Sequence, residues 1–141
     1  MVNGHVVDAS NFNKYSPTIK TISVRLIFLI VVYKKLSIMT SDIMNAFPTA
    51  PCRERIWSRT EPEFGETDGS LVTLNRALYG LPTAAISLHD FVGDTLRRIG
   101  FIPSRADQEL WIIKAKDHDG YDYLATHVDD LIIAAKRPGQ Y

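Results

Sequence analysis

The stretch YDYLATHVDDLIIAAK, residues 121–136, places two adjacent carboxylates between two runs of β-forming residues. Alternate side chains of a strand point to opposite faces, so this pattern predicts a β-hairpin with Asp129 and Asp130 at or beside its tip. Aspartate is a favoured turn residue, which makes a solvated acidic turn one interpretation. A cation site is the other, because two carboxylates this close repel each other unless a cation neutralises them.

A third carboxylate favours the cation site. Asp42 ends a predicted strand over residues 36–42 and is followed by IMNAF. A lone aspartate at a strand end is more often a turn residue, but three carboxylates gathered from distant parts of a chain suit Mg²⁺, which prefers oxygen ligands. Asp42, Asp129 and Asp130 are therefore the candidate metal ligands, with Mg²⁺ as the expected ion and Mn²⁺ as an alternative.

The rest of the pattern predicts an α+β chain. A helix is expected from Thr18 or Thr21 to about residue 35, in preference to a pair of strands. An amphipathic helix is expected over residues 83–99, stopped by Gly100. Residues 1–18 look irregular, residues 43–47 begin a short element that Pro48 interrupts, and residues 78–82 form a turn. Further strands are expected at residues 55–59, 71–74, 110–114, 121–127 and 131–135, with an exposed acidic loop at residues 61–69.

Composition narrows the class of protein. The 141 residues fit one domain, the apolar content of 45% suits a globular chain, and the net charge of zero argues against a stand-alone nucleic-acid binder. One cysteine excludes an internal disulfide and suits a reducing compartment. No secretion signal is evident. The apolar block of residues 21–33 contains Arg25 and is shorter than the roughly 20 residues of a membrane span, so it is expected to be a buried element.

Several motifs occur in an order that resembles a known family. DIMNAF (42–47), RALYGLPTAA (76–85), GFIPSRADQELWII (100–113) and THVDDLIIA (126–134) resemble the reverse transcriptase of copia-type LTR retrotransposons. YSPTIKTISVRLIFLIVV (15–32) and RIWSRTEPEFG (55–65) resemble two further segments of the same family. Each motif is short, but together they cover nearly the whole chain in the family's order.

The resemblance implies a fold and a reaction. It implies an antiparallel polymerase-palm sheet, ferredoxin- or RRM-like, backed by helices, with incomplete fingers and no thumb. Residues 1–141 would form a single partial domain, with a palm core over about residues 15–136 and an irregular segment over residues 1–14. The reaction would be nucleotidyl transfer from a dNTP to a primer 3′-hydroxyl on an RNA or DNA template. The partners would be template-primer, dNTP and the remaining polyprotein parts: fingers, thumb, RNase H and integrase.

The resemblance also assigns site residues. Asp42, Asp129 and Asp130 would be the catalytic carboxylates that hold two Mg²⁺ ions. The nucleotide would be bound by Ile43, Asn45, Ala46, Phe47, Tyr79 and Gly80. Residues 43–46 would offer backbone N–H groups to the triphosphate, the Phe47 ring would exclude a 2′-hydroxyl, and Tyr79 and Gly80 would line the pocket.

The sequence departs from the family at one position that bears on the site, because His127 stands where the family has tyrosine before Val-Asp-Asp. As an isolated enzyme the chain is expected to have little activity, since primer and template would not be held. Two alternatives remain: a non-catalytic retroelement remnant that persists as a folded interaction module, and an unrelated metal-dependent phosphohydrolase. The expected location is the cytoplasm, within particles, or the nucleus.

Overall fold

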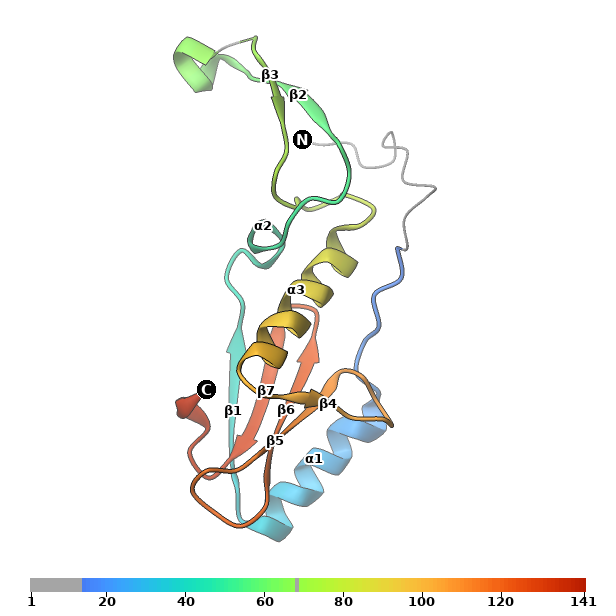
Figure 1. The fold of residues 1–141 in the computed structure, drawn as a ribbon, viewed down its shortest axis with the longest axis vertical. Helices are drawn as coiled ribbons and strands as arrows, with labels where there is room; N and C mark the ends of the chain where they lie inside the picture. The colour runs from blue at the N-terminus through green and yellow to red at the C-terminus, as the bar shows by residue number, and fades with distance from the viewer. Residues whose placement is uncertain (1–13, 68) are drawn as a thin grey trace. The chain divides into compact units, whose positions relative to one another are not determined.

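The computed structural model describes residues 14–67 and 69–141 (Figure 1). These residues form two compact units. The first contains residues 14–16 and Asn45–Phe91, and the second contains Pro17–Met44 and Val92–Tyr141. Helix α3 (Ala84–Arg98) continues across the boundary. The expectation of a single domain over residues 1–141 remains a prediction.

The second unit is built on a five-stranded antiparallel sheet with the order β1-β7-β6-β5-β4. The strands are β1 (Ser37–Asp42), β4 (Ile102–Pro103), β5 (Leu110–Lys114), β6 (Tyr121–His127) and β7 (Asp130–Ala135). The predicted α+β class and antiparallel pairing are confirmed. The sequence pattern missed β4, because a two-residue strand has no periodicity of its own.

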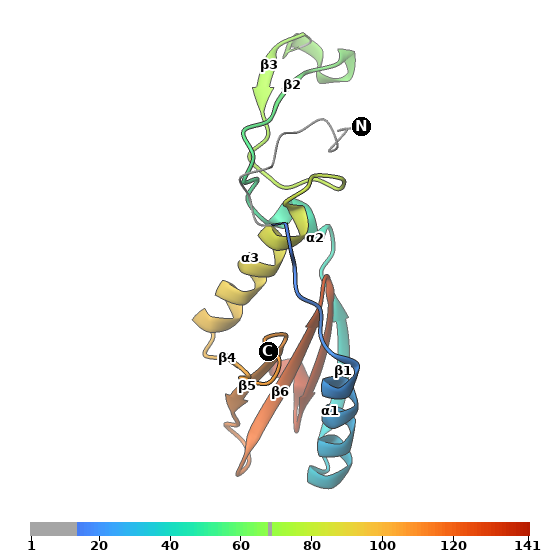
Figure 2. The ribbon, with the colours of Figure 1, turned by 90° about the vertical axis from the view of Figure 1, so that its right-hand side faces the viewer.

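Helices cover both faces of this sheet (Figure 2). On one face Leu96 of α3 packs in a buried cluster with Leu124 of β6. On the other face Ile27 of α1 (Thr21–Lys34) packs with Ala125, the next residue of β6. Since successive strand residues point to opposite faces, β6 contributes to both clusters.

Helix α1 differs from its prediction in two ways. Its N-cap residue is Lys20, and no side-chain cap bond is made there, so neither Thr18 nor Thr21 is the cap. Its buried residues are Ser23 and Ile27, while Val32 and Tyr33 are 77% and 80% exposed. The expectation of a buried element was wrong, because the helix meets the sheet along one narrow stripe.

Among the described residues no helix is long and apolar enough to cross a membrane.

The first unit contains a two-stranded hairpin of β2 (Trp57–Arg59) and β3 (Leu71–Thr73). Pro48 does not interrupt an element but lies inside the short helix α2 (Ala46–Thr49), where a first-turn proline loses no intrahelical bond. Within the expected loop at residues 61–69 the chain forms 3₁₀ turns, η2 (Pro62–Thr67). The C-terminal segment of the second unit carries a similar turn, η3 (Pro138–Gln140).

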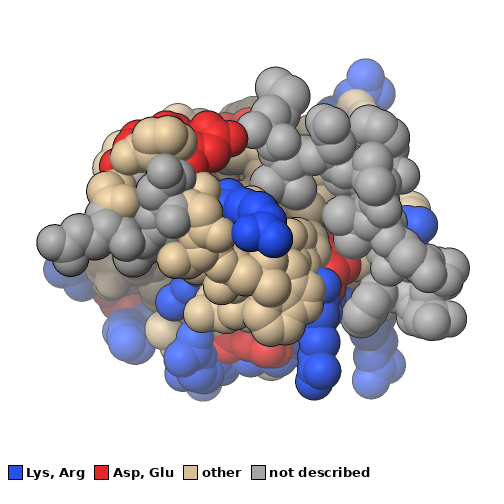
Figure 3. Space-filling model, turned by 90° about the horizontal axis from the view of Figure 1, so that it is seen from above, with Lys and Arg blue, Asp and Glu red and all other residues tan. Residues whose placement is uncertain are grey.

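Charged side chains of both signs are interspersed over the described part of the face seen in Figure 3. This agrees with the formal net charge of zero.

Candidate functional site

The tip of the β6–β7 hairpin carries the two adjacent aspartates, as the sequence predicted. His127 and Asp130 are paired across the strands, which leaves Val128 and Asp129 as the two central residues of the turn. Val128 has φ of 60° and Asp129 does not have a positive φ, the pattern of a type II′ turn. A β-branched residue is strained in this region, and such strain is tolerated where the surrounding structure over-determines the backbone.

Strand β1 brings the third aspartate to the same end of the sheet. Asp42 is the register partner of Asp130, and the Ile43 N–H donates to the Asp129 carbonyl over 2.9 Å. The three carboxylates thus stand on neighbouring backbone positions although they come from distant parts of the sequence. Asp42 and Asp130 are exposed, and Asp129 is half-buried.

These carboxylates suit a hard divalent cation, because their oxygens are the ligands that such a cation prefers and an ion could reach them from solvent. Among the described residues, none of the three is joined to a basic side chain by an ion pair, so their oxygens remain available. They are not drawn tightly around one point, however. Within the described part of the chain, the only three ligand atoms that lie within 4.8 Å of one another belong to Asp117, His118 and Asp122. Mutual repulsion keeps unneutralised carboxylates apart, and a bound cation would remove it.

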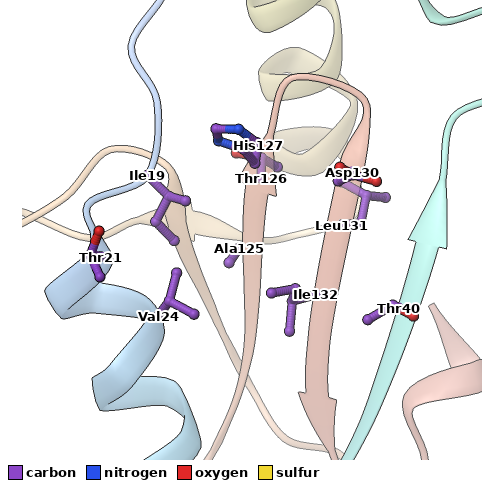
Figure 4. Close-up of a pocket in the computed structure, with 10 residues that line it drawn as sticks. All are labelled: Ile19, Thr21, Val24, Thr40, Ala125, Thr126, His127, Asp130, Leu131 and Ile132. Carbon is purple, nitrogen blue, oxygen red and sulfur yellow. The ribbon is translucent and has the colours of Figure 1, made fainter.

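A cavity of about 490 Å³ adjoins the hairpin tip between α1 and the sheet (Figure 4). His127 and Asp130 line its upper end, and Thr40, Ala125 and Ile132 line the sheet side. Asp130 shares this face with Ile132 because they are two positions apart on β7. Sequence reasoning missed the cavity, since its lining residues come from α1 and from three strands that meet only in the folded sheet.

The candidate nucleotide residues divide between the two units. In the first unit the rings of Phe47 and Tyr79 meet edge to face, with centroids 4.7 Å apart and planes at 84°. Gly80 has φ of 89° and the Leu81 N–H donates to the Leu78 carbonyl, which confirms the predicted turn. The structure therefore brings together two residues that the sequence separates.

The residues expected to bind the triphosphate through backbone amides, 43–46, are not equivalent in the structure. The Ile43 N–H already donates to the Asp129 carbonyl, so the expectation of a free amide there is not met. Asn45, with φ of 51°, is the N-cap of α2, and no side-chain cap bond is made at it. Ala46 is fully buried, which restricts it to a backbone contribution.

Comparisons with known proteins identify the family of this chain. Residues 2–140 match the family described as reverse transcriptase (RNA-dependent DNA polymerase). The retrovirus-related Pol polyprotein from transposon RE1 of Arabidopsis thaliana is 28% identical over 126 residues, which are 88% of this chain and 8% of that protein. The corresponding polyprotein from transposon RE2 of the same plant is 26% identical over 121 residues, 84% of this chain and 8% of that protein.

A third relative is shorter. The putative transposon Ty5-1 protein of Saccharomyces cerevisiae is 31% identical over 102 residues, 71% of this chain and 32% of that protein. The chain thus spans about a twelfth of the two plant polyproteins that it matches. No solved structure matches it significantly. The ordered motifs, the family match and the transposon relatives together place this chain in the reverse transcriptase family, as a fragment of the copia type.

Proposed function

We propose that this chain carries the metal-binding carboxylates of an RNA-directed DNA polymerase. The observation that supports the proposal is the pairing of β1 with β7, which sets Asp42 opposite Asp130 and bonds the Ile43 amide to the Asp129 carbonyl. The antiparallel sheet that they share would be the polymerase palm. Fingers, thumb, RNase H and integrase would be supplied by other parts of a polyprotein.

The protein's own role in the reaction is to position charge. When bound, Mg²⁺ or Mn²⁺ ions would stabilise the charge that develops as the primer 3′-hydroxyl displaces pyrophosphate from a dNTP. Asp42 and Asp129 would be the principal ligands and Asp130 a supporting one. The turn at Val128 sets the backbone position of Asp129, and the three carboxylates would draw together as the ions bind.

The proposed contacts to the nucleotide rest on the family resemblance. Phe47 would exclude a 2′-hydroxyl and so select deoxynucleotides, and Tyr79 buttresses its ring by the edge-to-face contact. Replacing Phe47 by Val is expected to raise ribonucleotide incorporation relative to deoxynucleotide incorporation. Asn45, Ala46 and Gly80 would contribute backbone groups.

Metal binding gives the first test. Calorimetry with Mn²⁺ should show binding that Asp42→Asn and Asp129→Asn each weaken at least tenfold, because each removes a charged ligand. Asp94→Asn, an exposed change on α3, is the matched control and should retain the parent affinity. Unchanged binding in both site variants would remove these residues from the proposed site.

Primer extension tests the reaction itself. A Mg²⁺-dependent incorporation assay at high protein concentration should give slow extension by the chain and none by Asp129→Asn. Equal incorporation by the two proteins would exclude Asp129 from the mechanism.

A non-catalytic interaction module is the second candidate. It is favoured by the spacing of the three carboxylates, which do not lie within 4.8 Å of one another among the described residues, and by His127 in place of the family's tyrosine. If the folded chain binds neither Mg²⁺ nor Mn²⁺, this candidate replaces the polymerase site.

A further inference from the structure

A second group of ionisable side chains lies in the β5–β6 hairpin, away from the aspartates of the proposed polymerase site. Asp117 and His118 belong to the loop between the strands, and Asp122 is the second residue of β6. Their ligand atoms all lie within 4.8 Å of one another. The residues KDHDG (116–120) between the strands are typical of a turn and by themselves indicate no site, because the contribution of Asp122 depends on how the hairpin closes.

Asp122 has an oxygen without a hydrogen bond. Its side chain is fully buried, and its Oδ2 accepts the Tyr141 hydroxyl over 2.7 Å. Its Oδ1 makes no hydrogen bond to any described residue. A buried carboxylate oxygen in this state is costly unless a cation or proton donor faces it.

The group that faces this oxygen is the imidazole of His118, whose other ring nitrogen pairs with Asp117. His118 Nε2 lies 3.7 Å from Asp122 Oδ1, and His118 Nδ1 lies 2.9 Å from Asp117 Oδ1. Arg137 occupies the other Asp117 oxygen over 3.0 Å, so that carboxylate is fixed in place. A proton on Nδ1 shared with Asp117 leaves the Nε2 lone pair directed toward Asp122, as in carboxylate–histidine–metal arrangements.

We propose that His118 Nε2 and Asp122 Oδ1 are ligands for a divalent cation of the zinc type, with Asp117 orienting the imidazole ring. Two ligands of one zinc ion at about 2.1 Å each stand about 3.4 Å apart in tetrahedral geometry, close to the observed separation. An imidazole nitrogen and carboxylate oxygens form a ligand set that suits Zn²⁺ better than Mg²⁺.

A cavity of about 300 Å³ borders His118 on the face of β6 opposite Asp122, and Lys34, Asp119, Gly120, Tyr121 and Tyr123 also line it. Gly120 has φ of 140°, so a side chain there would be strained by the backbone conformation, and its Cβ would meet His118 Nε2 at an ordinary contact distance of 3.7 Å. The ion would tie this loop to the C-terminal segment through Arg137 and Tyr141, and the site is independent of the proposed polymerase function.

The test uses Zn²⁺ with the full chain in an Asp42→Asn/Asp129→Asn background, so that the hairpin-tip carboxylates do not contribute. Calorimetry should show one ion per chain. His118→Asn should weaken binding at least tenfold, and Asp117→Asn about tenfold through loss of ring orientation. His89→Asn is the matched control, because His89 also pairs with a neighbouring aspartate, and it should retain the parent affinity.

Imidazole NMR spectra make the result specific to the site and do not depend on the buried Asp122 tolerating substitution. Zinc should shift the His118 Nε2 resonance at one equivalent, before the other three histidines respond. It should also raise the melting temperature of the parent but not of His118→Asn. Equal zinc affinity of the parent and His118→Asn, or a His118 ring that is doubly protonated at neutral pH and indifferent to zinc, would overturn the proposal.

Discussion

At the scale of single residues, a strained backbone position lies in the turn of the proposed site. Val128 holds φ of 60° between the paired residues His127 and Asp130. Glycine is the residue that a type II′ turn prefers at this position, and valine is among the least suited. The strained turn also carries the carbonyl of Asp129, to which the first residue after β1 is bonded.

Relief of this strain can be measured. Val128→Gly should raise the free energy of unfolding by up to about 1 kcal/mol, since the strain relieved exceeds the added chain entropy of glycine. Val128→Ala keeps a Cβ and should change the free energy of unfolding less. Urea denaturation of the three proteins gives the comparison, and a clear loss of stability in Val128→Gly would show that the turn is not strained.

At the scale of elements, a side chain from a distant loop secures the start of α1. The Asp107 carboxylate accepts the backbone N–H of the N-cap residue Lys20 over 2.9 Å and the hydroxyl of Ser23 in the first turn, so it anchors the start of the helix from outside. Burial alone would raise the pKa of Asp107, but the hydrogen bonds from Ser23, Lys20 and Glu109 outweigh it and lower the pKa. Lys20 adds a favourable charge.

This contact predicts a pH dependence. Because the pKa of Asp107 is lowered in the folded state, its stabilisation is present above the unfolded value of about 3.9 and is lost as pH falls through the folded value. Asp107→Asn should lower the free energy of unfolding by about 1–2 kcal/mol at pH 7. The difference from the parent should shrink below pH 3, as urea denaturation at both pH values would show.

The control for this prediction lies on α3. Asp94→Asn removes a carboxylate whose partner, Arg97, is also exposed, and it should change stability by no more than about 0.5 kcal/mol at either pH. A constant difference between Asp107→Asn and its parent across this range would contradict the assigned cause.

At the scale of the whole molecule, each compact unit contains one of the two tryptophans. Trp57 is 60% exposed in the first unit, and Trp111 is 2% exposed in the core of the second. Their fluorescence emission is therefore expected to differ. Variants that keep only one tryptophan can report the unfolding of each unit separately.

The stability of the second unit should fall strongly when a core side chain is shortened. Leu124→Ala removes a side chain that is 3% exposed and lies in the cluster with Trp111, so it should cost about 3 kcal/mol in the transition that Trp111 reports. Ile102→Ala, at a site 65% exposed on β4, is the control and should cost much less. A similar cost for the two changes would mean that this cluster does not dominate the stability of the unit.

Local patterns in the sequence determined the elements and the candidate ligands. The two long helices, the β6–β7 hairpin and the turn at Gly80 follow from periodicity and turn chemistry, which act between near neighbours. Asp42, Asp129 and Asp130 were identifiable as residue types at strand ends, and the ordered motifs indicated the family. These features need no knowledge of which strand pairs with which.

Only the tertiary structure decided which residues meet. Tertiary structure decided the pairing of β1 with β7, the hydrogen bond from Lys20 to Asp107 at the start of α1, and the approach of His118 to Asp122. The exposure of α1 was also set at this level, because a helix buries only the stripe that its neighbour covers. Long-range pairing is the sum of many weak contacts along two faces of a sheet, so no single stretch of sequence encodes it.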